Sequence, residues 1–407
     1  MTPTPEGAVP TEPSPGGLPA WLEAVLLSCL APASPLTDAA LRGVADGVAD
    51  WAALTKAATD QGLAGLLTRR LVQAAVRLPA EGREALERLA AQVDLRASRA
   101  TGQLVRMVGL LADNGVAAMP IKGPAQSQDL HGDVACRTFT DLDIVVPAAD
   151  ALRARELLVA EGFTLVQPRR ADVPERRLLH GEGELAVAGP DGDPLVELHW
   201  RVGWRFPSAS IAAEELLARP RSVELFGREV LQPAPVDQLI VLCVHGSHHA
   251  WEKLELMAGV LAAADRLDDA VWPSALERAA QLGQLRRTLV GMVVSHRVAG
   301  LSLPLPVRLA AAGDPLVGPL VAQAAEVWRR NALEEPDSVE RLRRILWLAR
   351  TGDSVKDGLG ALWRRAVTPG YEDWDSLRLP WSLAGLYYLW RPLRLAAKFA
   401  PRTSRPD

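Results

Sequence analysis

Two aspartates separated by one residue are the feature of this 407-residue sequence that most strongly suggests chemistry. Asp141 and Asp143 lie in the segment TDLDIVVP, whose alternation of polar and apolar residues predicts a strand. Alternating side chains would place both carboxylates on one face, with their Cα atoms roughly 6–7 Å apart. Because two like charges this close favour a cation, and hard oxygen ligands suit Mg²⁺, the pair is a candidate metal site. The alternative, common for so short a motif, is a strand end with two solvated acids.

Two further segments supply groups that such a site would need. Glu197 lies in PLVELHW, a second predicted strand in which Val196 and Leu198 are apolar, so its carboxylate is a candidate third ligand. Lys122 and Gly123 lie between a predicted strand and a short predicted helix. Glycine lets the backbone approach a phosphate there, and a helix N-terminus favours negative charge. Lys122 adds a positive charge, whereas the proline that follows supplies no N–H.

Several other polar side chains have two interpretations. His199 shares a strand face with Glu197, and it would either contact metal or phosphate or be a core histidine. Cys136 adjoins Arg137, which would lower its pKa, but without a catalytic partner we expect it to be a bystander. Three histidines without a surrounding HExxH motif are expected to pack or to contact nucleotide rather than form a separate metal site: His245, His248 and His249. A charge-rich loop is expected to be a solvated face: Arg169, Arg170, Asp172, Glu175, Arg176 and Arg177.

The elements that position these residues fall into five expected regions. Residues 1–18, rich in proline and glycine, are expected to be disordered. Residues 19–110 show the three- and four-residue apolar spacing of successive helices, with a stop at Asn114-Gly115. In residues 111–234 short strands alternate with short helices, and both LLHGEGELAVAG and PLVELHWRV are expected strands before the hairpin RSVELF-GREVLQP. Helices resume in residues 235–350. Residues 351–407 end in an apolar and basic helix at 380–400, bent near Pro392.

This pattern predicts an α+β fold, dominated by helices, in which a small mixed sheet is flanked by helical domains. The composition, 48% hydrophobic and 23% charged, is that of a globular protein. The net charge of −4 argues against an extended nucleic acid as partner. The three cysteines are far apart, which argues against a disulfide framework or a zinc knuckle.

No apolar run approaches the ~20 residues of a membrane span, and the N-terminus lacks a secretion signal, so a cytoplasmic location is expected. The aromatic and basic residues of segment 380–402 would suit peripheral contact with an anionic membrane. We favour packing of this segment against the helical domain.

As a set, the motifs resemble the bacterial "uncharacterised nucleotidyltransferase" family of the polymerase-β-like nucleotidyltransferase superfamily. The resemblance rests on Ile121-Lys122-Gly123, on D-L-D-I-V-V after seventeen intervening residues, on Gly162-Phe163 and on V-E-L-H-W at residues 196–200. Arg137 occupies the place of an arginine that precedes the D-[IL]-D motif in that family. The close resemblance covers residues 116–201, and a looser one, with H-x-x-x-H and W-x-x-L, continues to about residue 305.

The resemblance implies transfer of a nucleoside monophosphate from a nucleoside triphosphate (NTP) such as ATP to an acceptor, with pyrophosphate leaving. It implies that Mg²⁺ or Mn²⁺ is held by three acidic residues: Asp141, Asp143 and Glu197. Glu197 would complete the acceptor-side metal and take the acceptor proton. The groups implied to bind the nucleotide are Lys122, Gly123, Arg137 and His199. The acceptor stays open among a protein, a peptide and a small molecule.

The sequence departs from the superfamily and family patterns at three places. The third carboxylate is Glu197 instead of the usual aspartate, and an aspartate often found after W-x-x-L aligns with about Gly259. The superfamily's Gly-Ser turn is replaced by Lys122-Gly123, as in this family generally. Two rival hypotheses therefore remain: a catalytically inactive binding or adaptor module with the same fold, and a peripheral membrane adaptor that acts through residues 380–402.

Overall fold

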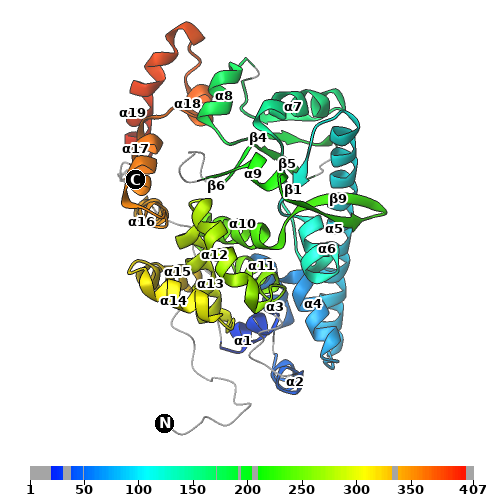
Figure 1. The fold of residues 1–407 in the computed structure, drawn as a ribbon. Coiled ribbons are helices and arrows are strands. Elements are labelled where there is room, and N and C mark those ends of the chain that lie inside the picture. Colours follow the sequence, from blue (N-terminus) through cyan, green and yellow to red (C-terminus); the bar gives the residue numbers. More distant parts are fainter. Residues whose placement is uncertain are drawn as a thin grey trace, which may run out of the picture.

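The structure, a computed structural model, describes residues 20–30, 38–48, 50–170, 172–190, 194–203, 210–331 and 338–399. The segment expected to be disordered, residues 1–18, lies outside these ranges. The described chain is an α+β fold in which helices predominate around a small mixed sheet (Figure 1). This architecture confirms the fold class predicted from the sequence. Among the described residues, no helix combines the length and the apolar character needed to cross a membrane.

The N-terminal part is a succession of helices, as the apolar spacing predicts. Its helices are α1 (Ala20–Ser28), α2 (Asp38–Asp46), α3 (Trp51–Asp60), α4 (Ala64–Gln73) and α5 (Ala80–Asp113). The long α5 ends at the expected Asn114-Gly115 stop, where Gly115 adopts a φ of +72°. Such a left-handed conformation is accessible to glycine at low cost and commonly ends a helix.

Five strands form the central sheet in the order β1-β2-β5-β4-β3. They are β1 (Met119–Pro120), β2 (Asp141–Val145), β3 (Thr164–Gln167), β4 (Glu184–Ala188) and β5 (Leu195–His199). Strands β2 and β5 are parallel, and the other neighbours are antiparallel. Between them lie α6 (Pro124–His131), the 3₁₀ turns η1 (Val134–Cys136) and η2 (Ala148–Asp150), α7 (Ala151–Ala160) and α8 (Glu175–Gly181).

The strand expected over LLHGEGELAVAG is shorter than predicted, because its first residues belong to α8. That helix starts directly after Pro174, a residue whose fixed φ suits a helix start, and it buries Leu178 against the sheet core. Strand pairing begins only at Glu184. The second expected strand, PLVELHWRV, is interrupted after His199, and β6 (Arg201–Gly203) pairs with β7 (Ser210–Ala212) in a separate two-stranded sheet.

The hairpin RSVELF-GREVLQP is confirmed as β8 (Pro220–Leu225) and β9 (Arg228–Pro233). The remaining elements before the C-terminal region are α9 (Ala213–Leu217), α10 (Pro235–His248), α11 (Leu254–Ala264), η5 (Asp269–Val271), α12 (Trp272–Gln281), α13 (Leu285–Ala299), α14 (Leu305–Gly313) and α15 (Val317–Asn331). The C-terminal region contains α16 (Ser338–Arg350), α17 (Val355–Val367), α18 (Tyr371–Ser376), η6 (Trp381–Leu386) and α19 (Tyr387–Phe399). The expected final helix therefore begins as a 3₁₀ turn, and Pro392 lies inside α19.

Helices α10 and α11 are separated by a tight turn in which Ala250 and Trp251 both have positive φ values. The fully buried Trp251 folds back over Gly246, where a Cβ atom would lie 2.4 Å from the indole ring. Glycine at 246 is therefore required by this close approach. The turn matters for the site because it sets the end of α10, where the three neighbouring histidines lie.

Two main hydrophobic cores hold these elements together. The first is shared by helices α1–α5 and helices α10–α16, so the N-terminal and the later helices bury their apolar faces against one another. The second lies under the sheet, where Leu142, Ile144 and Leu198 pack against α5 and α7. Tyr371 and Trp374 of α18 join this second core, which fastens the C-terminal region to the sheet. The opposite face of the sheet carries the polar side chains described below, beside a third, smaller core in which Met119 and Val145 pack with residues of α10.

Candidate active site

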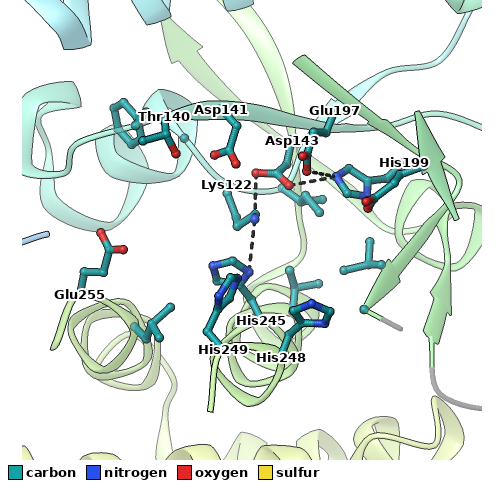
Figure 2. Close-up of a pocket in the computed structure, with 18 of the residues that line it drawn as sticks. Lys122, Thr140, Asp141, Asp143, Glu197, His199, His245, His248, His249 and Glu255 are labelled. Atoms are coloured by element: carbon teal, nitrogen blue, oxygen red, sulfur yellow. Dashed lines mark hydrogen bonds and ion pairs between the residues drawn. The ribbon is translucent and has the colours of Figure 1, made fainter. Parts of the chain in front are cut away.

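Asp143 and Glu197 are direct neighbours across the parallel strands β2 and β5. The residues that flank Asp143 along β2 are buried in the sheet core, so the aspartate points to the opposite face. An oxygen of Asp143, an oxygen of Glu197 and a ring nitrogen of His199 all lie within 4.8 Å of one another. Asp143 is only 3% exposed, so it is not a solvated acid at a strand end. Asp141, at the start of β2, is half-buried on the same face (Figure 2).

His199 ties three carboxylates together. Its Nε2 atom lies 2.9 Å from Asp143 Oδ1 and 3.5 Å from Glu197 Oε2, and its Nδ1 atom lies 3.0 Å from Glu184 Oε2. Burial would lower the pKa of His199, but the charge of Glu184 and the hydrogen bonds to the carboxylates hold this pKa well above its ordinary value. The imidazole therefore favours its protonated form, which hydrogen-bonds Asp143 through Nε2 and pairs with the Glu184 charge on the Nδ1 side. Of the two interpretations made from the sequence, the structure places His199 among the carboxylates.

Lys122 reaches the same carboxylate from the turn before α6. Its Nζ atom lies 2.8 Å from Asp143 Oδ2 and donates to His245 Nδ1 at 3.2 Å (Figure 2). Burial would raise the pKa of Asp143, but the Lys122 charge and the His199 hydrogen bond hold this pKa well below its usual range. Asp143 is thus an ionised, buried carboxylate with a cationic partner on each oxygen.

Gly123 gives the turn its shape. It has a φ of +81° and a ψ of −154°, a region that is essentially restricted to glycine. The turn is fastened to β2 by the hydrogen bond from the Ile121 N–H to the Asp143 carbonyl, at 3.1 Å. This bond fixes Lys122 beside Asp143, and Pro124 then begins α6.

The two aspartates repel one another. Burial and the neighbouring Asp143 charge raise the pKa of Asp141. A divalent cation bound between the carboxylates would relieve this repulsion, and oxygen ligands suit Mg²⁺ or Mn²⁺. The donor set on this face therefore fits a hard metal ion. His199 pairs with the carboxylates here, and its ring nitrogen, once deprotonated, lies where it would ligate the same ion as Asp143 and Glu197.

Arg137 lines the same cavity, and a hydrogen bond to Gln126 holds its guanidinium group. It is buried, and its Nη1 group donates to Gln126, whose amide in turn donates to the Ile121 carbonyl at 3.3 Å. Among the described residues, its Nε has no hydrogen-bond partner. A Cβ atom at Gly259 would lie 3.8 Å from Arg137 Nη1. Position 259 is thus next to this arginine, and with glycine there Gln126 is the hydrogen-bond acceptor of Arg137.

His245 and His248 of α10 and His249, directly after it, form one wall of the cavity (Figure 2). Their rings contact edge to face, with centroids 4.6 Å apart between His245 and His249 and 5.3 Å apart between His248 and His249. Burial and the Lys122 charge keep the pKa of His245 well below its ordinary value, so its neutral ring accepts the Lys122 hydrogen bond. Among the described residues, these histidines form no group of three metal-ligating side chains.

The cavity has a volume of about 530 Å³, and all the site residues inferred from the sequence line it. A second cavity of about 510 Å³ shares three of its lining residues with the first, namely Glu182, Glu184 and Arg365. The other wall of this second cavity comes from α16, α17 and α19. The polar site therefore adjoins a more apolar space lined by the C-terminal helices.

Some groups lie where the sequence did not indicate. Glu184 reaches the site because β4 pairs with β5 in a register that sets Glu184 opposite His199. The alternation in E-L-A-V-A, with Leu185 and Val187 in the sheet core, was the sequence signal that Glu184 points to the opposite face. In contrast, Cys136 is buried, and burial raises its pKa to about 11, so the alternative of an activated thiol is wrong.

The charge-rich loop does not line the cavity that contains the carboxylates. Arg170 pairs with Asp172 at 2.7 Å and lies over the ring of Trp381, 4.4 Å from its centroid. It also donates to the hydroxyl of Tyr387 at 3.1 Å. This arginine therefore fastens η6 and the start of α19 to the sheet domain.

Comparison with known proteins adds one match. Residues 47–300, more than half of the chain, match the model of a family described as an uncharacterised nucleotidyltransferase. The matched range contains the carboxylates, the Lys122 turn and the histidines at the end of α10. The C-terminal wall of the second cavity, including Arg365, lies outside it. No curated protein matches the chain significantly.

Proposed function

The chain belongs to the uncharacterised nucleotidyltransferase family, and from that membership and the site geometry we propose that it is a metal-dependent enzyme. It transfers a nucleoside monophosphate from an NTP to an acceptor, and pyrophosphate leaves. The observation that carries the proposal is the meeting of two carboxylates from adjacent strands, Asp143 and Glu197, with Lys122. The cavity around them, about 530 Å³, is of a size that binds nucleotide-sized ligands.

We assign the metal ligands to the oxygen donors of the sheet face: Asp141, Asp143 and Glu197. Bound there, Mg²⁺ or Mn²⁺ would neutralise phosphate charge and orient the reacting oxygens. Lys122 and Arg137 contact the phosphates, and the glycine conformation at residue 123 lets the backbone approach them. His199 and Glu184 keep the carboxylates oriented. Glu197 takes the acceptor proton, because its side chain is more exposed than that of Asp143, 27% against 3%.

We place the acceptor in the second cavity, because this cavity adjoins the first and shares Glu184, the ion-pair partner of His199, with it. Its polar groups largely bond one another: Lys398 pairs with Glu372 at 3.1 Å, and Arg394 pairs with Asp373 at 2.6 Å. The surface left for a ligand includes Leu362, Ala366 and Leu395. This lining favours an acceptor with an apolar body, such as a peptide side chain or a small apolar alcohol, over a highly charged one.

One observation favours a rival function. Both oxygens of Asp143 are already engaged, one by Lys122 and one by His199, so a metal ion must compete with two cationic groups. A nucleotide-binding module without turnover would tolerate this arrangement. The rival predicts nucleotide binding with no pyrophosphate release.

A transfer assay separates the two functions. The purified protein is incubated with Mg²⁺ and each of the four NTPs, labelled at the α-phosphate, together with a panel of peptides and small alcohols. Pyrophosphate release and label transfer are measured. We expect Mg²⁺-dependent release that Asp143→Asn lowers by at least ~10²-fold.

The matched control for this assay is Asp150→Asn. Asp150 lies outside the cavity and accepts no capping hydrogen bond at the start of α7, so its amide should leave the rate unchanged. Nucleotide binding without pyrophosphate release for any acceptor would favour the binding module. Equal loss in both variants would mean that the assay reports folding and not the site.

A further inference from the structure

The C-terminal helices expose an unusual amount of apolar surface. Of the seventeen large hydrophobic side chains that are exposed among the described residues, ten lie between residues 338 and 399. They are Leu342, Leu346, Val355, Leu359, Trp363, Leu383, Leu386, Tyr388, Leu389 and Leu393. We call this set the C-terminal apolar surface. Concentrated exposure of this kind marks an interaction site, because single exposed hydrophobic residues are normally scattered.

Helix α19 is amphipathic in the reverse sense from an ordinary surface helix. Both of its arginines face inward, where Arg391 donates to Asp373 Oδ2 at 2.5 Å and Arg394 donates to Asp373 Oδ1 at 2.6 Å, whereas Lys398 near its end is exposed. Leu389 and Leu393, one turn apart, point outward and are 68% and 65% exposed. A helix that buries arginines in ion pairs and presents leucines to the outside is suited to an apolar neighbour.

Helix α17 continues the same kind of surface. Val355, Leu359 and Trp363 follow one another at four-residue intervals, which places them on one side of the helix, and they are 72%, 62% and 69% exposed. This helix packs against both α16 and α19. Together, the three helices form the outer edge of the molecule, away from the N-terminal helices (Figure 1).

The net charge of this region indicates which kind of partner the C-terminal apolar surface would contact. Residues 338–399 contain eleven Lys and Arg against six Asp and Glu, a net charge of +5, although the whole chain has a net charge of −4. The rest of the chain therefore has a net charge of −9. Arg350 of α16, Lys356 of α17 and Arg378, in the connection between α18 and η6, are exposed. A basic region with an apolar outer face matches an anionic lipid surface, where leucine and tryptophan enter the headgroup boundary and basic groups meet the phosphates.

We propose that the C-terminal apolar surface docks this protein on anionic lipid membranes. A second copy of the chain is the less suitable occupant, because pairing the same surface would bring two regions of charge +5 together. The inference does not depend on the proposed transfer reaction, since it uses none of the carboxylates of the sheet face. It also differs from the packing against the helical domain that we favoured from the sequence, because the packed side of α19 is its charged side.

Vesicle co-sedimentation tests the proposal. The full chain is mixed with sucrose-loaded vesicles of phosphatidylcholine alone or with 30 mol% phosphatidylglycerol, at low salt and in 0.5 M NaCl. We expect binding to the anionic vesicles, at least tenfold weaker binding to the neutral ones, and weakening by salt. The double variant Leu389→Glu/Leu393→Glu should lower the partition coefficient at least tenfold, since both side chains already face outward and the fold is retained.

The matched control is Leu305→Glu/Leu309→Glu on α14, where two leucines are also one turn apart and 57% and 65% exposed. This variant should bind the anionic vesicles as the wild type does. The proposal is overturned if the wild type leaves both kinds of vesicle unbound, as it would if a protein were the natural partner. It is also overturned if the control loses binding equally, or if light scattering shows a dimer that only the α19 variant dissociates.

Discussion

Replacement of Asp143 by asparagine probes the arrangement at the centre of the site before any substrate is known. The change removes one negative charge and keeps the shape of the side chain. Lys122 and His199 then lose their shared counter-ion in a place where Asp143 is only 3% exposed. Removal of one partner from a buried ion pair costs about 3–5 kcal/mol. Because the asparagine oxygen still accepts one hydrogen bond, we expect a loss of stability of about 3 kcal/mol.

The expected shift of the unfolding midpoint follows from the size of the protein. With an unfolding entropy of about 2.1 cal/mol/K per residue, a loss of about 3 kcal/mol lowers the midpoint by about 3–4 °C if unfolding is cooperative. The pH dependence has a definite sign. The pKa of Asp143 is depressed in the folded state, so its stabilisation is present above the unfolded value of about 3.9 and is lost as the pH falls towards the folded value. Because the hydrogen bond to Asp143 also helps to raise the pKa of His199, the difference between wild type and variant should increase as the pH falls from 7 to about 5 and then shrink below about pH 4.

Thermal unfolding followed by tryptophan fluorescence in EDTA measures this difference, with Asp150→Asn as the control. Equal midpoints for wild type and Asp143→Asn at pH 7 would refute the reasoning, because the ion pairs would then contribute nothing. A difference that grows as the pH falls below 4 would also contradict it. A loss of similar size in Asp150→Asn would show that amide substitutions destabilise the protein in general.

Other predictions concern the nucleotide, the turn, the second cavity and the thiols. Lys122→Met should weaken NTP binding about 10- to 100-fold by calorimetry, the size of a lost charge-assisted hydrogen bond, whereas Lys56→Met on α3 should not. Gly123→Ala should destabilise by about 1–3 kcal/mol in urea titration because of the φ of +81°, whereas Gly313→Ala, with open space around it, should be neutral within ~0.5 kcal/mol. Ala366→Trp should narrow the second cavity and slow transfer to the acceptor with unchanged NTP affinity, and an affinity change would refute our placement of the acceptor. The three buried cysteines should react with Ellman's reagent only in denaturant, and fast native labelling would contradict their burial.

The sequence predicted those parts of the site that depend on local pattern. Alternation along β2 and β5 determines which side chains share a face. Asp143 and Glu197 each lie between two apolar residues, so both were expected on the face opposite the core. The turn at Lys122-Gly123 was also predictable, because a glycine between a predicted strand and a predicted helix indicates a turn. What could not be predicted was the role of Glu184, which depends on how β4 is registered against β5.

Long-range packing accounts for the other differences. No residue pattern shows that helices α1–α5 share a core with α10–α16, because many pairings of apolar faces satisfy the same spacing. The break between α10 and α11 has no glycine or proline at its centre, and Ala250 and Trp251 adopt positive φ because Trp251 packs on Gly246. The inward-facing arginines of α19 depend on Asp373, a residue that charge counting alone does not distinguish from a solvated acid.

Calorimetric titration of ATP, GTP, CTP and UTP, in Mg²⁺ and in EDTA, measures whether the carboxylates of the sheet face bind a nucleotide through a metal ion. The proteins compared are the wild type, Asp141→Ala/Asp143→Ala and the control Asp150→Asn, each shown to be folded by circular dichroism. The account predicts Mg²⁺-dependent binding of at least one nucleotide by the wild type and the control, and its loss in the double variant. Absence of binding by the wild type under every condition, or unchanged binding by the folded double variant, would contradict it.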